Sequence, residues 1–180
     1  MPLRAGKGSY YEGGIRKPLI VRWPGKIKAG SVCDIPVSGI DFFPTFIEAA
    51  NTEKPAGKIL DGVSLLPLLQ QNRTIPDRPL FWHFPIYLEA YFNDGPFETR
   101  DRKFRTRPGS AVRFEKWKLL EYFEDGELEL YNLEEDIGEK HNLAKTSPGK
   151  ANQLLAMLQS WRYEMKAPVP AELNPEYRPS

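Results

Sequence analysis

Residues 6–18 read GKGSYYEGGIRKP, in which Lys7 stands between two glycines and a glycine pair follows at 13 and 14. Because glycine has no β-carbon, the backbone on either side of Lys7 can come close to a ligand. The lysine ammonium is a compact cation that stabilises negative charge on a group being transferred. From spacing alone, Lys7 is either such a group or an ordinary loop lysine. We expect the glycine pair to allow a tight backbone path, and Glu12 to pair with Arg16 and brace the loop.

Outward from this segment, the residue pattern predicts an α+β architecture. An apolar run at 18–23, closed by Pro-Gly, predicts a strand, and capped apolar faces predict helices at 41–50 and 65–71. The later elements are a strand at 80–84, a long surface loop at 91–108, an antiparallel meander at 111–114, 117–123 and 128–131 with a turn at Asp125-Gly126, and a final helix from Pro148. We therefore expect a strand with two helices, then a small sheet covered by one helix.

Composition narrows the classes of function. The chain has 180 residues, of which 41 % are hydrophobic, so it can bury a core. The formal net charge is +1 and basic residues are spread along the chain, which argues against a nucleic-acid partner. No apolar run has the length of a membrane span. A single cysteine, Cys33, excludes an internal disulfide.

The segment at 6–18 resembles a signature of the type I sulfatases, of the form G-K-G-x-x-Y-E-G-G-[IV]-R-x-P. The resemblance continues in order through nearly the whole chain. Its further blocks are Trp23-Pro24-Gly25, Asp41-Phe42-Phe43-Pro44-Thr45, LDGVSLLPLL at 60–69, LELYNL at 128–133, Asp136 and Asn142-Leu143. A match in this order is more specific than the glycine segment alone.

This resemblance implies an α/β fold like that of alkaline phosphatase and a contact between Lys7 and the substrate sulfate. Residues 1–76 would form the C-terminal end of the catalytic α/β domain, and residues 77–180 the small C-terminal α+β subdomain, with an antiparallel sheet and a C-terminal helix. The first part would pack on a sheet that this chain does not contain. Exposed apolar surface is therefore expected around Phe42, Phe43, Leu65 and Leu68.

Two features of the family pattern have no match in this sequence. The nucleophile motif is Cys- or Ser-x-Pro-x-Arg, and its first residue is oxidised to formylglycine; after Cys33 the proline comes one position late. A stretch of the right shape begins at Thr74, but oxidation of threonine gives a ketone rather than an aldehyde. The ligands of the family's calcium ion are also missing. The acids at 134–136 and the two histidines lack the convergence or spacing of a metal site, so we predict no metal ligand in this chain.

His83 is a second candidate for the substrate pocket. Strand alternation places it on the face opposite Trp82 and Phe84. Similar segments of sulfatases lie near the pocket, so the resemblance implies a contact with the leaving group or sugar. The alternative is a strand histidine whose ring is satisfied by its neighbours. His141 lies in a charged loop and is predicted to be exposed.

We interpret the chain as the C-terminal part of a sulfatase that hydrolyses sulfate esters, inactive without its N-terminal portion. The alternatives are a non-catalytic module that holds sulfated glycans through Lys7, Arg16, Trp82 and Tyr87, or a partner chain of a split sulfatase. The expected substrate is a sulfate ester, with sulfated glycans among the candidates, and no nucleic-acid or membrane partner is expected. The first residues show no export signal, whereas the resemblance implies a periplasmic, extracellular or lysosomal location.

Overall fold

The chain divides into two compact units. The sheet unit comprises Met1–Lys17 and Arg78–Ser180, and the helical unit comprises Pro18–Asp77. In the sequence-based division at 76/77, residues 1–17 went with the first part, whereas in the structure they pack with the sheet. The assignment of residues 1–76 to the end of a catalytic domain stays a prediction. The computed structural model describes residues 2–71, 74–89, 99–100 and 103–172.

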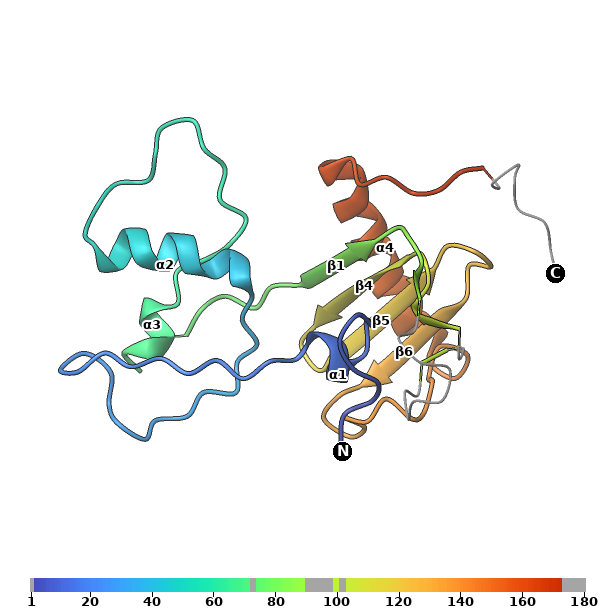
Figure 1. Ribbon diagram of the computed structural model, residues 1–180, viewed down its shortest axis with the longest axis horizontal. Helices are drawn as coiled ribbons and strands as arrows, with labels where there is room; N and C mark the ends of the chain where they lie inside the picture. The colour runs from blue at the N-terminus through green and yellow to red at the C-terminus, as the bar shows by residue number, and fades with distance from the viewer. Residues whose placement is uncertain (1, 72–73, 90–98, 101–102, 173–180) are drawn as a thin grey trace. The chain divides into compact units, whose positions relative to one another are not determined.

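Four antiparallel strands, in the order β1-β4-β5-β6, form the main sheet of the sheet unit (Figure 1). The predicted meander is present, and β1 adds to its edge by pairing with β4. The connection between β5 and β6 contains the predicted turn at Asp125-Gly126. The bounds of the strands are β1 (Leu80–Phe84), β4 (Gly109–Phe114), β5 (Trp117–Tyr122) and β6 (Leu128–Asn132).

Helix α4 (Pro148–Met165) covers one face of this sheet, and it begins at the predicted proline. Proline is tolerated in the first turn because its missing N–H would have no partner there. Leu154 and Leu158 of the helix are buried against Leu119 and Leu130 of the sheet. In Figure 1 the helix crosses behind the strands. Within the described residues, no helix is long and apolar enough to cross a membrane.

The opposite face of the sheet is covered by the segment that precedes and includes α1 (Glu12–Ile15). Tyr10 and Tyr11 are buried there in a second core cluster, together with Leu120, Tyr122 and other residues of the sheet. In Figure 1 this segment lies in front of the strands. The sheet thus has two apolar faces, as strand alternation requires when both sides are covered.

A separate two-stranded ladder pairs β2 (Leu88–Glu89) with β3 (Phe104–Thr106). The prediction of a loop throughout 91–108 is wrong for β3, because its charged sequence shows no apolar alternation although two of its three residues are buried. Residues 91–98 and 101–102, which belong to the same predicted loop, lie outside the described residues.

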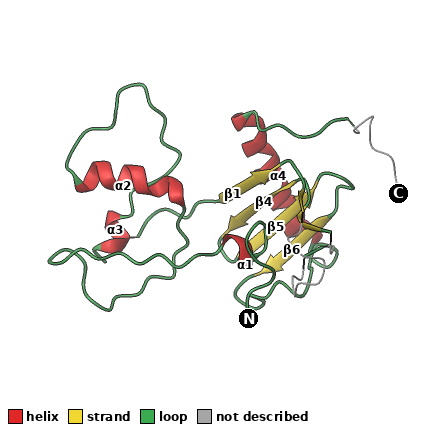
Figure 2. Cartoon of the chain, in the orientation of Figure 1, coloured by secondary structure: helices red, strands yellow, loops and turns green. Residues whose placement is uncertain are grey.

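The helical unit contains η1 (Gly39–Asp41), α2 (Phe42–Ala49) and α3 (Leu66–Leu69), joined by irregular segments (Figure 2). Asp41 precedes α2 as predicted, but its carboxylate accepts from the backbone N–H groups of Ser38 at 2.7 Å and Val63 at 3.0 Å. These two bonds tie the start of α2 to the segment before α3. The strand predicted at 18–23 is wrong: those residues are irregular, and Ile20 is 90 % exposed.

The expected exposure of apolar side chains is confirmed for α2 and wrong for α3. Phe42 and Phe43 are exposed. Leu65 and Leu68 are instead buried in a small core with Ile75. The residues around α3 therefore form a core within their own unit. The aromatic side chains of α2 are exposed and do not belong to that core.

Candidate functional site

Lys7 lies in a tight turn, residues 6–9, which we call the Lys7 turn. The backbone N–H and the hydroxyl of Ser9 both donate to the carbonyl oxygen of Gly6, at 3.2 and 2.9 Å. Ser9 is buried, whereas Lys7 is exposed. Among the described residues, the ammonium group of Lys7 has no hydrogen-bond or ion-pair partner. The turn therefore holds its backbone in place and leaves the cation accessible.

Gly8 explains why glycine is needed beside Lys7. Its φ of +91° lies in the region that side chains rarely adopt, and an added β-carbon would lie 2.6 Å from Cδ2 of Leu88. Arg105 of β3 lies on the same side, and its Nη1 donates to the carbonyl oxygen of Lys7 at 3.5 Å. The β2–β3 ladder thus packs directly against the Lys7 turn.

Gly13 and Gly14 pack tightly against the backbone before and at the end of the Lys7 turn. A β-carbon on Gly13 would lie 2.3 Å from the carbonyl oxygen of Arg4, and one on Gly14 would lie 2.2 Å from that of Ser9. The N–H of Gly13 also donates to the carbonyl of Arg4 at 2.9 Å. The expected tight backbone path is present, although it leads through α1 into irregular chain rather than into a strand.

Tyr10 anchors the turn to the edge of the main sheet. Its hydroxyl oxygen lies 2.9 Å from the carbonyl oxygen of Phe84 and 2.7 Å from that of Gly109. Burial raises the pKa of Tyr10, so the phenol stays protonated and remains a donor at neutral pH. This anchor joins the segment to the neighbouring strands β1 and β4.

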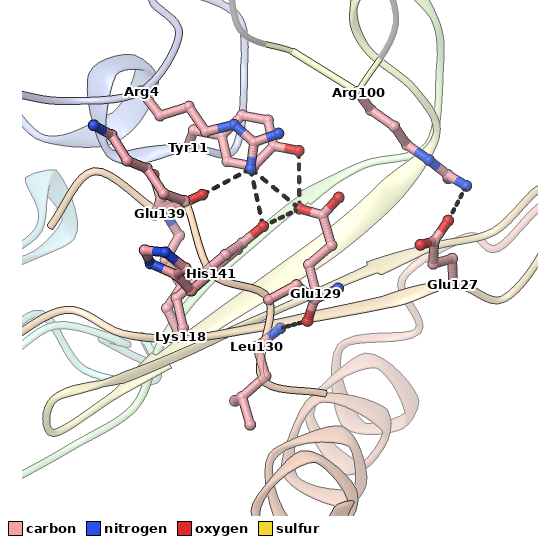
Figure 3. Close-up of polar contacts among 12 residues, drawn as sticks. Arg4, Tyr11, Arg100, Lys118, Glu127, Glu129, Leu130, Glu139 and His141 are labelled. Atoms are coloured by element: carbon pink, nitrogen blue, oxygen red, sulfur yellow. Dashed lines mark hydrogen bonds and ion pairs between the residues drawn. The ribbon is translucent and has the colours of Figure 1, made fainter. Parts of the chain in front are cut away.

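Tyr11 anchors the same segment to β6. Its hydroxyl donates to Oε2 of Glu129 at 2.8 Å, and the hydroxyl of Tyr131 donates to the same oxygen at 2.9 Å. The guanidinium of Arg4 lies over the Tyr11 ring, with its Cζ 3.9 Å from the ring centroid, and its Nη1 donates to the Tyr131 hydroxyl at 2.9 Å (Figure 3). A buried network of phenols, carboxylate and guanidinium therefore lies under the turn.

Glu12 has a buried ion-pair partner in addition to the predicted Arg16. The predicted pair with Arg16 is present, at 3.7 Å between Nη1 and Oε2. The glutamate is only 1 % exposed, however, and Nζ of Lys118 donates to its Oε1 at 3.0 Å. The same Nζ lies 2.8 Å from Oε1 of Glu139. Sequence reasoning did not select Lys118 or Glu139; the available signal was a lysine inside the largely apolar strand WKLLEY.

His83 lies on the other face of the sheet from the Lys7 turn. Its Nε2 is 2.9 Å from the carbonyl oxygen of Pro168, and its Nδ1 is 2.7 Å from the hydroxyl of Ser110. Because a carbonyl only accepts, Nε2 carries the proton in this arrangement. The ring centroid lies 6.3 Å from that of Trp161 of α4. The structure therefore does not bring Lys7 and His83 together, and both ring nitrogens of His83 have partners.

A metal site is not formed by the part of the chain that the structure describes. No group of three or more His, Cys, Asp or Glu side chains there could hold a metal ion. Cys33 is exposed. His141 is exposed as predicted, and its nearest carboxylate is that of Asp136, at 3.5 Å. These residues do not fit the calcium site that the family resemblance implies.

The Lys7 turn therefore presents an accessible positive charge, which attracts anions. It presents one ammonium group from a turn whose flanking residues are buried and bonded to three strands of the sheet. A cation placed where negative charge develops can stabilise a group that is being transferred.

Comparisons with known proteins match nearly the whole chain. Residues 6–166 match the family described as N-sulphoglucosamine sulphohydrolase, C-terminal. A protein named sulfatase from Formosa agariphila is 36 % identical over 183 residues, which cover 93 % of this chain and 31 % of that protein. This chain thus spans about a third of the length of that relative.

Solved structures also match most of this chain. The complex of Ps i-CgsB with k-i-k-neocarrahexaose has a TM-score of 0.69 at 28 % identity, covering 91 % of this chain and 32 % of that one. A structure in complex with its substrate D-glucosamine-2-N,6-O-disulfate has a TM-score of 0.58 at 25 % identity, covering 86 % of this chain and 30 % of that one.

Proposed function

We propose, from the premise that this chain belongs to the N-sulphoglucosamine sulphohydrolase C-terminal family of sulfatases, that it is the C-terminal part of an enzyme that hydrolyses sulfate esters. The observation that carries the proposal is the exposed ammonium of Lys7 on an anchored turn, at the start of the family match. A sulfate ester spreads its negative charge over terminal oxygens, which such a cation binds. In this proposal, Lys7 binds the sulfate and stabilises the charge that develops as the ester bond breaks.

The rest of the chemistry is assigned to the part of the relatives that this chain does not span. We infer that an N-terminal portion contributes the nucleophile and the ligands of a calcium ion, and that this chain forms one wall of the pocket. His83 is left out of the proposed pocket, because its ring contacts the segment after α4 and lies on the other face of the sheet.

A sulfated sugar is the substrate class that we propose to test first. The support is the matched structure that contains D-glucosamine-2-N,6-O-disulfate as its substrate. The exposed lysine itself selects only for an anion. The sugar assay is therefore run beside a chromogenic aryl sulfate, which reports sulfatase activity without a requirement for sugar recognition.

The proposal is tested by measuring hydrolysis of both sulfates in the presence of calcium. The chain is assayed alone, and again joined to or mixed with the N-terminal portion encoded upstream. Activity is expected only when both portions are present. In that active form, Lys7→Ala is expected to lower kcat/KM by about 10²- to 10³-fold, the usual loss for one group that stabilises transition-state charge.

Lys145→Ala is the matched control, because Lys145 is an exposed lysine outside the Lys7 turn. Its kcat/KM should stay within about twofold of the unchanged protein, as expected for a surface change. Activity of the chain alone would contradict the assignment of the nucleophile to the other portion. Full activity of Lys7→Ala would exclude the role given to Lys7. Binding of the sugar without turnover in the joined form would support a glycan-binding module instead.

A further inference from the structure

Lys118 lies fully buried between two carboxylates from different segments of the chain. Its Nζ is 3.0 Å from Oε1 of Glu12 in α1 and 2.8 Å from Oε1 of Glu139, which follows β6. Glu12 and Glu139 are themselves 1 % and 0 % exposed. The three charges therefore join α1, β5 and the segment after β6 at one point.

The carboxylates of this group have further partners. Oε2 of Glu139 accepts the backbone N–H of Glu12 at 2.6 Å. Oε2 of Glu12 lies 3.7 Å from Nη1 of Arg113 and 3.7 Å from Nη1 of Arg16. Burial raises the pKa of Glu139, and the neighbouring Lys118 opposes that effect. Glu12 is thus held by its side chain and by its own backbone N–H.

Glu139 adopts an unusual backbone conformation at this point. Its φ is +52°, in the left-handed region, where a side chain meets a steric penalty that glycine avoids. A glycine immediately before it, Gly138, does not take this conformation. The chain therefore accepts a strained residue where its carboxylate reaches both Lys118 and the N–H of Glu12, as occurs where the surroundings over-determine a position.

A buried ion pair is weak support for a role in stability, because removing the charges from water offsets their attraction. Such contacts can instead orient the groups that they join. In some proteins, buried charges specify one arrangement of the groups around them. In this chain, one of the two carboxylates belongs to Glu12 of α1.

The position of Glu12 is transmitted to both flanks of the Lys7 turn. Gly13 follows Glu12 directly and donates to the carbonyl of Arg4, on the N-terminal side of the turn. Gly14 packs against the carbonyl oxygen of Ser9, on its C-terminal side, with no room for a β-carbon. A shift of α1 would therefore move the turn, since these contacts leave no slack between them.

We propose that Lys118 is a positioning residue, which fixes the Lys7 turn through Glu12 without touching the substrate. This inference rests on the proposed function, in which Lys7 binds the sulfate. It assigns to the C-terminal sheet a part in placing that cation, through a contact between β5 and α1 that spans 106 residues of sequence.

The test is a double-mutant cycle in the active form, with Lys118→Met and Lys7→Ala, measuring kcat and KM for the aryl sulfate. A displaced turn is expected to lower kcat/KM by about 10- to 100-fold in Lys118→Met, the size expected when a group moves by about 1 Å. In the Lys7→Ala background the same change should have less than about a twofold effect, because the affected group is already absent.

Hydrogen exchange of the chain itself gives a second readout that does not need activity. In Lys118→Met, the amides of Ser9 and Gly13 should exchange at least about tenfold faster, while amides of β5 and β6 change less. Glu121→Gln is the matched control: it breaks the pair with Arg162, 2.5 Å between Oε2 and Nη1, on the same strand but toward α4. It should leave the Ser9 and Gly13 amides and the kinetics unchanged.

A variant that removes the three charges of this group together covers the case in which Lys118→Met does not fold. This is the triple variant Glu12→Gln, Lys118→Met, Glu139→Gln, which removes all three charges together and keeps similar volumes. It is expected to fold and to show the same loss of kcat/KM and of protection at Ser9 and Gly13.

The outcomes separate the inference from the proposed function. An equal loss of kcat/KM with and without Lys7, or unchanged exchange at Ser9 and Gly13, would overturn the positioning role and leave the proposed function standing. Full activity in the Lys7→Ala single variant would overturn the proposed function, and this inference with it.

Discussion

The hydroxyl of Tyr11 donates to the carboxylate of Glu129 at 2.8 Å, across 118 residues of sequence. The donor lies in the segment that carries the exposed lysine, and the acceptor lies in β6. Burial raises the pKa of Tyr11, and the neighbouring Tyr122 and Glu129 add to the effect, so the phenol remains the donor. This contact is one of the most direct links between the N-terminal segment and the sheet.

Removing that hydroxyl should destabilise the chain. Tyr11→Phe leaves Glu129 with one phenol fewer and leaves the Tyr122 hydroxyl, 3.2 Å away, without its acceptor. We expect the free energy of unfolding in urea to fall by about 2 kcal/mol, as for the loss of a buried hydrogen bond to a charged group. Tyr163→Phe on α4, where Tyr163 is 87 % exposed, should change it by less than about 0.5 kcal/mol. Equal effects would contradict the buried network.

The glycine pair gives a second prediction. Gly14→Ala places a β-carbon 2.2 Å from the carbonyl oxygen of Ser9, and a backbone atom cannot move aside as a flexible side chain does. We expect a loss of about 3 kcal/mol or more, together with loss of Lys7-dependent activity. Gly149→Ala is the control, because nothing lies within 4 Å of its added β-carbon. That change in α4 should be neutral or stabilising by up to about 1 kcal/mol, and a similar loss in both variants would exclude the close approach.

Stability should depend on pH through His83. Burial lowers the pKa of His83, with a further contribution from Arg162, although the bond to Pro168 opposes it. The unfolded chain then binds more protons than the folded chain below the ordinary histidine value of about 6.5. The contribution of His83 is therefore complete above that pH and is lost as the pH falls through the lowered pKa.

Urea unfolding between pH 7.5 and 5 checks this sign. The fall in unfolding free energy toward pH 5 should be smaller in His83→Gln than in the unchanged chain. If the pH dependence of the unfolding free energy is unchanged in His83→Gln, other titratable groups cause it.

The exposed aromatic side chains of α2 should bind a hydrophobic dye. Phe43 and Phe46 are 52 % and 64 % exposed. Replacing both by serine should lower dye fluorescence of the folded chain by about half or more, because contiguous exposed apolar surface is what such dyes contact. Ile59→Ser removes a side chain that is 88 % exposed in an irregular segment, and should have little effect. If all variants bind the dye equally, the exposed surface lies elsewhere.

Local patterns were sufficient to predict the parts of the fold that local contacts determine. The helix from Pro148 has its apolar stripe at Leu154 and Leu158, and both are buried as the spacing requires. The alternation of residues on either side of Asp125-Gly126 predicted the meander. The run at 18–23 failed because an apolar segment forms a strand only beside a partner, and no strand pairs with it among the described residues.

The candidate site was only partly predictable for a related reason. Lys7 could be selected as a candidate because residues 6–18 resemble a family signature, whereas its glycine neighbours alone left its role open. Lys118 could not be, because its carboxylates lie 106 residues before it and 21 residues after it, and nothing in the local pattern pairs them. Glu139 was further obscured by the neighbouring acids at 134–136, because nothing in the local sequence distinguishes it from them, although Glu139 is fully buried.

The long sequence separation of these anchors has a consequence for synthesis in the cell. The segment around Lys7 leaves the ribosome before the strands of the sheet do, and Glu12 cannot contact Glu139 until 127 further residues have been made. At ordinary rates of translation this delay is on the order of ten seconds. During that interval Tyr10 and Tyr11 have no sheet to cover, so the nascent chain exposes them. We therefore expect this segment to stay unprotected until the sheet has been made, and to be a place where a chaperone acts.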